Sequence, residues 1–575
     1  MRVKKTSSKN KEHYSIIKDV RTLEGKRTTK IVENLGSWNK IVQRAGDKDP
    51  ELWLKEYLLE LNKKEDTKIL IEKDKKVLIK TNEQRKFNCG YLFLQDIYYK
   101  LGLNKICNVI DNKHQFHFSL NDIMSKLVYG RIIEPSSKLS TYEFSKTLLE
   151  QPSFQLHDIY RALEVISKES DFIQSELYKN SSKYCERNNR VLYYDCTNFF
   201  FEIEQDDDFR KYGVSKEHRP NPIVQMGLFM DGDGIPLSFD MNPGNTNENI
   251  TLKPLEEKII KDFNLSTIVV CTDAGLASKA NRKFNNTNNR KFITTQSIKQ
   301  LKQELKDWAL NKTGWHITGL ENTTIDISKL DNDETLRSKW KDTTFYKEKW
   351  IKDDDGFEQK MIVTYSIKYA DYQRNIRNNQ IKRASNLINS NPTKIGKPKQ
   401  NDFKRFISTT VTTEDGKETT KKEYSINQEV ILEEMKYDGF YAVCTNLEDD
   451  PIEIIKVNHR RWEIEESFRI MKSEFDARPV YLQREDRIRA HFMICFISLM
   501  IYRYLEKKLD YKYTVCEIID TLRNMAFLKE DKSNYSPIYT RTDITDLLHE
   551  KFCFRTDYEV IDYKNLTNLF ALTKK

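Results

Sequence analysis

The pattern of apolar and polar positions changes several times along the chain. In residues 14–35 the two kinds alternate on both sides of a turn at residues 24–26, which predicts a small β-hairpin. From about residue 41 to residue 188 apolar residues recur at helical spacing, with breaks at Pro135 and Pro152. The chain is therefore expected to begin with a hairpin and to continue as a helical domain.

One segment inside the helical domain admits two interpretations. RIIEPSSKLSTYEF (residues 131–144) has the composition of a turn between two helices. It could belong to a helix-turn-helix that reads DNA, or to plain helical packing, because nothing in the sequence fixes a helix that faces a groove.

After residue 190 the apolar period changes from that of helices to that of strands. RVLYYDCTNFFFE, IVQMGLFM and IPLSFDM are strand-like runs, and the second and third are joined by the turn at residues 231–234. A helical segment, the run STIVVCTD, a second helical segment and the run KFITT follow. The order β-β-β-α-β-α-β is that of an RNase H-like nuclease core, which predicts an α/β fold with a mixed sheet.

Residues 299–436 interrupt this pattern with Lys-rich sequence and short alternating runs, which predicts a β-rich insertion domain. Its stretch from Lys368 to Arg405 holds ten Lys or Arg against two Asp. This stretch is either a solvated, flexible surface loop or a track along a DNA backbone. Strand character returns in residues 439–446, and residues 451–475 predict one amphipathic helix.

These changes of pattern divide the chain into six predicted segments. They are an N-terminal β-hairpin element (1–40), a helical DNA-binding domain (41–188), the first part of the catalytic core (189–298), the β-rich insertion domain (299–436), the second part of the core (437–505) and a C-terminal helical region with a possible role in dimerisation (506–575).

Two acidic residues stand where an α/β sheet displays its functional groups. Asp195 lies inside an apolar strand, where an unpaired carboxylate costs several kcal/mol unless something neutralises it. Asp273 ends a second strand and begins a loop. Taken alone, each could also be a helix cap or a turn residue.

A third acidic residue comes from the helix predicted over residues 451–475. At about 100° per residue, four polar side chains fall within about 60° of one another on a single face of that helix. They are Asn458, Arg461, Glu465 and Lys472. Taken alone, Arg461 and Glu465 are equally well explained as an ordinary i,i+4 salt pair.

The chemistry of phosphodiesters is the reason to join these three acids. Cleavage and strand transfer are in-line displacements, which two hard cations about 3.5–4 Å apart can promote. Magnesium prefers oxygen ligands and takes few of them from protein. We therefore expect Asp195, Asp273 and Glu465 to be catalytic residues that hold two Mg²⁺ ions, with Asp195 bridging both.

The same segments resemble the cut-and-paste DDE transposases of bacterial insertion sequences, in the group whose RNase H-like core carries a β-rich insertion. That group has a Tyr-x2-Arg-x3-Glu-x6-Lys signature. Arg461, Glu465 and Lys472 match it, whereas Asn458 stands at the Tyr position. The resemblance extends from the N-terminal hairpin to about residue 505. Its most specific parts are YGVSKEHRPNPIVQMGLFMDGDGIPLSFDMNPGNTNE, CTDAGLASKAN, RWEIEESFRIMKSEFDARPVYL and IRAHF.

The resemblance implies double-stranded DNA as the partner, both transposon terminal inverted repeats and target DNA. It further implies a homodimer in the DNA complex, a hairpin at the transposon end, and Mn²⁺ as a substitute for Mg²⁺. Arg461, Lys472 and the residue at position 458 would contact DNA near the cleaved end. Four tryptophans are candidates for stacking a displaced base or for ordinary core packing: Trp308, Trp315, Trp340 and Trp350.

A polar loop before the second strand supplies further candidates for DNA contact. Lys216, His218 and Arg219 could touch the DNA backbone, although a polar loop needs no such role.

The amino-acid composition excludes few classes of protein. The net charge of +9 suits a polyanionic partner without requiring one. The nine cysteines show no CxxC, and the longest apolar stretch, residues 492–501, is about half of a membrane span. We therefore expect a reducing, cytoplasmic location and no membrane partner. Two other functions stay open: an RNase H-like nuclease that does not rejoin DNA, and a catalytically silent DNA-binding protein descended from a transposase.

Overall fold

The computed structural model describes residues 1–8, 11–21, 27–66, 71, 76–263, 265, 267–287, 289–318, 320–390, 402–413, 420–531 and 533–575. They form two compact units. The first consists of Met1–Phe87, Phe527–Ile538 and Thr556–Thr567, and the second of Asn88–Ala526, Tyr539–Arg555 and Asn568–Lys575.

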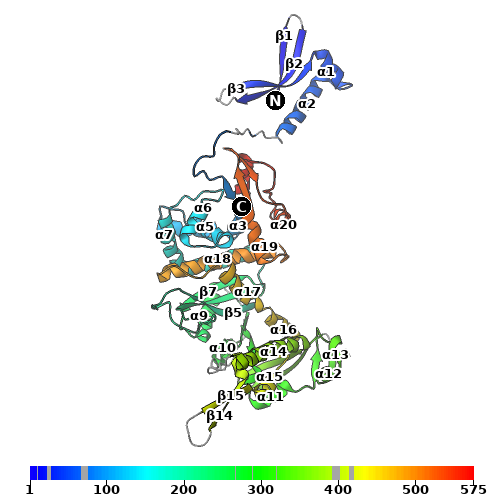
Figure 1. Ribbon diagram of the computed structural model, residues 1–575. Helices are drawn as coiled ribbons and strands as arrows, with labels where there is room; N and C mark the ends of the chain where they lie inside the picture. Colours follow the sequence, from blue (N-terminus) through cyan, green and yellow to red (C-terminus); the bar gives the residue numbers. More distant parts are fainter. Residues whose placement is uncertain are drawn as a thin grey trace. The chain divides into compact units, whose positions relative to one another are not determined.

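The first unit begins with a three-stranded antiparallel sheet, in the order β1-β2-β3 (Figure 1). Its strands are β1 (Arg2–Ser8), β2 (Lys11–Arg21) and β3 (Arg27–Gly36). The predicted hairpin corresponds to β2 and β3, and β1 adds a strand that the sequence did not indicate. The predicted turn Glu24-Gly25-Lys26 lies outside the described residues. Helices α1 (Trp38–Ala45) and α2 (Pro50–Asp66) cover this sheet over a core that includes Ile16 and Leu35.

A second, four-stranded sheet has the order β19-β18-β17-β4. Its strands are β4 (Lys86–Asn88), β17 (Ala526–Lys529), β18 (Asn534–Pro537) and β19 (Ile561–Asp562). The C-terminal region therefore holds strands as well as its helices, which are α19 (Val515–Asn524), α20 (Asp543–Phe552) and α21 (Tyr563–Thr573).

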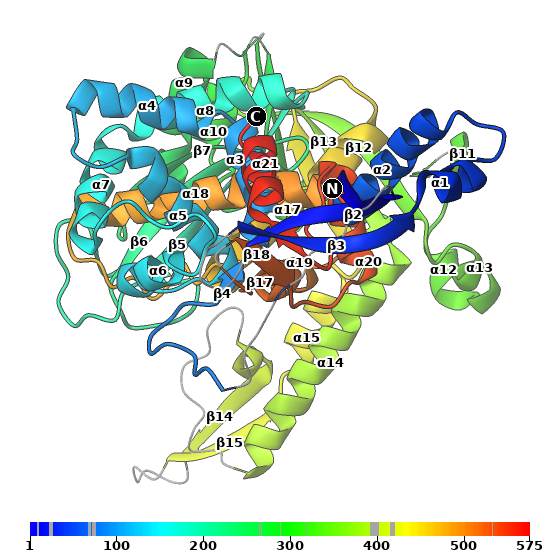
Figure 2. The same cartoon turned by 90° about the horizontal axis from the view of Figure 1, so that it is seen from above.

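Helix α18 (Glu485–Lys508) lies between helices and sheet, because it packs against α3, α5 and α7 and also against strand β7 (Pro236–Pro243) (Figure 2). The helices before the large sheet are α3 (Tyr91–Lys100), α4 (Leu103–His114), α5 (Leu120–Ile133), α6 (Lys138–Ser145), α7 (Leu156–Lys168) and α8 (Ser170–Tyr184). By length and hydropathy α18 could cross a membrane, but 94% of its apolar window is buried inside the protein, as in a core helix.

The second unit also contains a ten-stranded mixed sheet, in the order β11-β10-β12-β13-β16-β9-β8-β5-β6-β7. Strand β5 runs antiparallel to β6 and parallel to β8, and β8 runs parallel to β9. In chain order the first elements are β5 (Val191–Phe200), β6 (Ile223–Asp231), β7 (Pro236–Pro243), α9 (Glu248–Phe263), β8 (Ile268–Thr272), α10 (Lys279–Phe284) and β9 (Arg290–Gln296). The predicted order β-β-β-α-β-α-β and the mixed α/β fold are both confirmed.

The sequence that interrupts this order and the strand that follows it extend the same sheet. Strand β16 (Phe440–Thr445) pairs with β9, and β13 (Glu358–Ser366) pairs with β16. The other added strands are β12 (Thr344–Lys352), β10 (Trp315–Ile317) and β11 (Leu320–Ile325), while β14 (Ile407–Thr413) and β15 (Thr420–Ile426) form a separate hairpin. The short helices here are α11 (Gln303–Leu310), α12 (Lys329–Asn332), α13 (Glu334–Lys339) and α15 (Gln428–Met435).

The basic stretch that could have been a flexible loop is a helix over most of its length. Helix α14 (Ile367–Ser390) has 24 residues, so the loop interpretation is wrong for this part, and residues 391–401 lie outside the described residues. Arg377 is buried on the inner face of α14 and donates to both oxygens of Asp438 at 2.6 Å. This distant ion pair and the buried Ala370 and Ala384 hold a mostly polar helix in place.

Candidate active site

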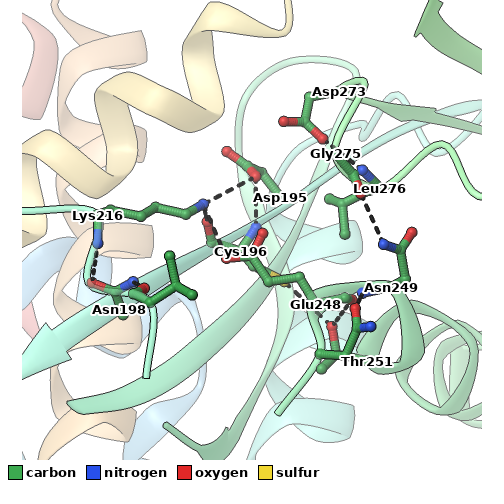
Figure 3. Close-up of polar contacts among 12 residues, drawn as sticks. Asp195, Cys196, Asn198, Lys216, Glu248, Asn249, Thr251, Asp273, Gly275 and Leu276 are labelled. Carbon is green, nitrogen blue, oxygen red and sulfur yellow. Dashed lines mark hydrogen bonds and ion pairs between the residues drawn. The ribbon is translucent and has the colours of Figure 1, made fainter. Parts of the chain in front are cut away.

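Asp195 lies in the middle of β5, between the antiparallel partner β6 and the parallel partner β8. The residue is only 8% exposed, and its Oδ1 accepts the backbone amide of Cys196 at 2.7 Å (Figure 3). Burial, opposed by Lys216 and reinforced by the nearby Asp273, raises the pKa of Asp195 to about 6. The side chain is thus a carboxyl group whose charge is poorly compensated by the protein.

Asp273 follows the last residue of β8, so the parallel pairing of β5 and β8 brings it next to Asp195. Its Oδ1 accepts the amide of Leu276 at 3.0 Å, which fixes the carboxylate at the start of the loop. Thr294 on β9 donates to its carbonyl oxygen at 3.2 Å. The two aspartates expected from the sequence therefore lie together, on neighbouring strands of the sheet.

Glu465 lies on a helix that is shorter than predicted. The single helix over residues 451–475 is wrong: α16 (Pro451–His459) and α17 (Trp462–Arg469) are separated by a turn, and a π-helical segment, η4 (Ile470–Glu474), follows. Two i→i+3 bonds, Arg461 N to Asn458 O and Ile464 N to Arg461 O, tighten the turn. The predicted common face of four polar residues therefore does not exist as one helical surface.

Arg461 lies at this turn and pairs with the third acid. Its Nη1 is 3.0 Å from Glu465 Oε1, the salt pair that the spacing allowed. Burial disfavours its charge, but Glu465, Tyr441 and both aspartates outweigh burial and raise the pKa of Arg461. Within the described part of the chain, the oxygens of the three carboxylates do not all lie within 4.8 Å of one another. Arg461 pairs with Glu465, whose side chain is 57% exposed.

Two lysines border the aspartates. Lys216 Nζ lies 3.9 Å from Asp195 Oδ1 and 3.4 Å from Glu248 Oε1, and it donates to the carbonyl of Cys196 (Figure 3). Burial opposes the charge of Lys216, but Asp195 and Glu248 outweigh burial and raise its pKa. Lys472, in the π-helical segment, lies 3.2 Å from Glu217 Oε1. Burial, together with the nearby charge of Lys216, lowers the pKa of Lys472 to about 8.

The other residues expected to touch DNA have different surroundings. His218 is exposed and has a positive φ of 56°, in a turn where Ser215 accepts backbone amides. Arg219 lies 4.2 Å over the ring of Phe200, away from the carboxylates. Asn458 is only 5% exposed, so it lies in the packing beneath the surface.

The four tryptophans that are candidates for base stacking differ in how exposed their side chains are. Trp315 is fully buried in the core beneath the added strands, and Trp308 and Trp340 pack against that core. Trp350, on β12, is 50% exposed. Of the four stacking candidates, Trp350 therefore offers the most open ring.

Two residues of the site were missed by sequence reasoning. Glu248 is the first residue of α9, where an acidic side chain is explained by the helix dipole alone. Tyr441 lies on β16, in a run that indicated only a strand; its hydroxyl accepts from Asn458 Nδ2 at 3.0 Å and lies 2.6 Å from Thr295 Oγ1. Each comes from an element far along the chain, so spacing gave no signal for either.

The donor set suits a hard divalent cation. Oxygen ligands are offered by the neighbouring Asp195 and Asp273, while Glu465 is paired with Arg461. Because Asp195 is desolvated and repelled by Asp273, a cation between these two side chains would favour the ionised form of both.

Comparison with known proteins identifies a family. The family model for the transposase DDE domain matches residues 195–501, more than half of the chain, beginning at Asp195. No curated protein shows significant similarity to the chain.

Solved structures with weak similarity include the synaptic complex of piggyBac transposase with hairpin DNA, at 9% identity over 85% of this chain and 86% of that chain, with a TM-score of 0.35. The paired-end complex of Mos1 transposase with the left transposon end has 13% identity over 44% of this chain and 70% of that chain, with a TM-score of 0.14. Similarity at this level identifies no corresponding residues.

Proposed function

The chain belongs to the transposase DDE domain family, and we propose that it cuts double-stranded DNA at terminal inverted repeats and joins the ends to target DNA by a cut-and-paste route. Asp195, Asp273 and Glu465 are its catalytic residues and metal ligands in this proposal. The observation that carries it is the pair of neighbouring aspartates, one on β5 and one directly after the parallel strand β8, with Asp195 desolvated and its nearest cation, Lys216, 3.9 Å away.

The core of this proposal is an RNase H-like sheet. In the order β7-β6-β5-β8-β9, the first three strands are antiparallel and the last two continue parallel to β5, which supports such a core. The insertion before Glu465 then extends the sheet through β16. The helical region before residue 189 would bind DNA, and two copies of the chain would hold the two transposon ends.

In this proposal the acidic residues bind the metal ions and the basic residues bind the phosphates of DNA. Bound Mg²⁺ ions, or Mn²⁺ in their place, would activate the attacking oxygen and stabilise the leaving oxygen. Asp195 and Asp273 present their oxygens from the rigid sheet. Glu465 must leave Arg461 to join them, and this exchange frees the guanidinium to bind a phosphate oxygen in a charge-assisted hydrogen bond. Lys216 and Lys472 lie near Asp195 and would add positive charge for the DNA backbone.

In this proposal Asn458 acts through Tyr441, to which it donates a hydrogen bond. The signature places a phenol at this position, and the chain has an amide that bonds to the phenol of Tyr441. We propose that Tyr441 supplies the missing hydroxyl near Arg461. The nearby Tyr441 is one of the groups that raise the pKa of Arg461.

The decisive experiment mixes the purified full-length protein with DNA that carries candidate terminal repeats, with and without Mg²⁺. A Mg²⁺-dependent cut at the repeat end, followed by joining to a target plasmid, is the expected result. Glu465→Ala should abolish both steps. Glu466→Ala is the matched control, because Glu466 lies on the same helix and pairs with Arg469 at 2.6 Å.

Two other results of this experiment would contradict transposition and support a different function. Cutting without joining would identify a nuclease. Binding of the repeats with no cutting under any metal condition would identify a catalytically silent DNA-binding protein.

A further inference from the structure

A second group of buried charges, opposite in sign to the aspartates, lies at the N-terminus of α6. A cavity of about 430 Å³ opens there between the end of α5, the start of α6, residues 476–482 and α18. Three cationic side chains and one carboxylate line it: Arg131, Lys138, Arg478 and Asp476. Arg478 is compensated by an ion pair with Glu217, so the other two cations are the ones that matter here. The segment Arg131–Phe144, which could have been part of a helix-turn-helix, supplies two of these cations.

Arg131 and Lys138 are buried without a counterion. They are 4% and 6% exposed, and neither forms an ion pair with any carboxylate among the described residues. Arg131 Nη1 donates to the carbonyl of Phe475 at 2.9 Å and Nη2 to that of Ser136 at 3.0 Å. Its Nε is buried and has no hydrogen-bond acceptor. Buried charges in proteins are normally paired, so this arrangement is incomplete.

The one side-chain partner of Lys138 is neutral. Lys138 Nζ lies 3.3 Å from His491 Nδ1, and His491 Nε2 lies 3.2 Å from the carbonyl of Ala477. The ring must donate from Nε2 to that carbonyl, which leaves Nδ1 as an acceptor for the ammonium group. Burial, with the positive charges of Lys138 and Arg131, holds the pKa of His491 well below its usual range. The histidine therefore accepts one hydrogen bond from Lys138 and brings no negative charge.

The backbone adds further donors. Ser137 caps α6 by accepting the amide of Ser140 at 3.2 Å. The preceding amides, of Lys138 and Leu139, have no acceptor inside the helix, and the N-terminus of a helix favours an anion. The start of α6, Arg131 and Lys138 therefore line one cavity. Burial, with the nearby charge of Arg131, lowers the pKa of Lys138 to about 7, so a bound anion would favour its charged form.

We propose that this cavity binds a phosphate group, held by Lys138, Arg131 and the first amides of α6. The identification of that phosphate as part of a DNA backbone rests on the proposed function. The cavity is many times larger than one water molecule, which leaves room for the sugars on either side of a backbone phosphate. Arg131 also bonds the carbonyls of Phe475 and Asp476, directly after the segment that holds Lys472, so the occupant would lie against the end of the catalytic segment.

The first test uses inorganic phosphate and the full-length protein in metal-free buffer. Phosphate should raise the melting temperature of the wild type above that in chloride at equal ionic strength. Lys138→Met should melt no lower than the wild type in chloride, because a desolvated charge is gone, and should lose the phosphate-dependent rise. Lys146→Met is the matched control, since Lys146 lies at the other end of α6, is 43% exposed and pairs with Glu143; it should respond as the wild type does.

Two results would overturn the site. The first is a full phosphate response in Lys138→Met. The second is an equal loss of melting temperature with and without phosphate, which would mean that Lys138 only supports His491. If Lys138→Met does not fold, ³¹P line broadening by the wild type decides the question, because the absence of broadening at millimolar phosphate contradicts the proposal.

A second test identifies the source of the phosphate. Fluorescence anisotropy with duplex DNA should show that Lys138→Met reduces the slope of log affinity against log salt by about one, whereas Lys146→Met leaves it unchanged. Phosphate binding with an unchanged DNA slope would overturn the DNA assignment and leave a site for free phosphate. Neither readout needs DNA cleavage, so failure of the proposed transposition and failure of this site can be told apart.

Discussion

Two buried aspartates on neighbouring strands have opposite surroundings. Asp231, at the end of β6, is fully buried, and Arg187 Nε donates to its Oδ2 at 2.7 Å. Its Oδ1 accepts the amides of Asp233 and Ile235. Asp195, on β5, accepts one hydrogen bond among the described residues, from Cys196, and its nearest cation is 3.9 Å away.

The difference separates a carboxylate that folding compensates from one that is left poorly compensated, as the proposed function requires of a metal ligand. The charge of Asp231 is fully compensated by groups that folding places around it. The charge of Asp195 is not, and its pKa rises to about 6 because the carboxyl is buried beside another acid. An incompletely paired carboxylate in a rigid sheet costs stability, and it gains a favourable partner only when a cation arrives.

The largest expected effect is on catalysis. Asp195→Asn should slow DNA cleavage by about a thousandfold or more, since a metal ligand contributes several kcal/mol to stabilising the transition state. The same variant should melt no lower than the wild type in metal-free buffer. Initial rates on repeat-bearing DNA and thermal melting measure the two effects. A variant that cuts at the wild-type rate would end the assignment of Asp195 as a ligand.

The opposite outcome is expected for the structural aspartate. Asp231→Asn should lower the free energy of unfolding by roughly 3–5 kcal/mol, because Arg187 is left buried and uncompensated. Urea denaturation measures the loss. The rate of DNA cleavage per folded molecule should stay near the wild-type level. A thousandfold loss of cleavage in fully folded Asp231→Asn protein would show that Asp231 is needed for cleavage as Asp195 is.

A smaller effect is expected on how the free energy of unfolding depends on pH. The folded-state pKa of Asp195, about 6, lies above its ordinary 3.8, so this group contributes stability below about pH 4 and loses it as pH rises through 6. Without metal, the unfolding free energy of the wild type relative to Asp195→Asn should therefore fall by up to about 3 kcal/mol between pH 4 and 7. Chemical denaturation of both proteins at each pH gives this difference.

Magnesium supplies the control for the pH experiment. At pH 7, Mg²⁺ should stabilise the wild type and leave Asp195→Asn almost unchanged. Equal stabilisation of both proteins would show that the ion binds elsewhere.

The smallest effect tests how Arg461 is positioned. Tyr441→Phe removes the acceptor of Asn458 and should lower stability by about 1 kcal/mol and cleavage by roughly tenfold. Tyr437→Phe is a suitable control, because its hydroxyl bonds Glu433 on α15 instead. Unchanged cleavage in Tyr441→Phe would mean that Asn458 and Tyr441 serve packing alone.

Much of the core could be predicted from the sequence. The change from helical to strand period at residue 190 and the turn at residues 231–234 led to the correct order of elements, because each signal is local. The transposase family is also confirmed, and it was found through the spacing of Arg461, Glu465 and Lys472. The assignment of these residues to the reaction stays a prediction.

What could not be predicted depends on contacts between distant segments. Apolar periodicity runs unbroken through residues 451–475, so nothing local marks the turn at Arg461 or the π-helical segment after it. Helix α14 has too few apolar residues to stand out, and its ion pair with Asp438 joins positions 61 residues apart. Glu248 and Tyr441 likewise reach the site only through the arrangement of the sheet.

The pairing of β16 with β9 joins the strand that follows the insertion to the first part of the core. Cys444 on β16 lies opposite Thr294 on β9, and the side chain of Thr294 donates to the carbonyl of Asp273. The strand to which the chain returns after the insertion therefore braces the start of the loop that carries Asp273. Strands of the insertion and the strand before this loop are parts of one continuous sheet.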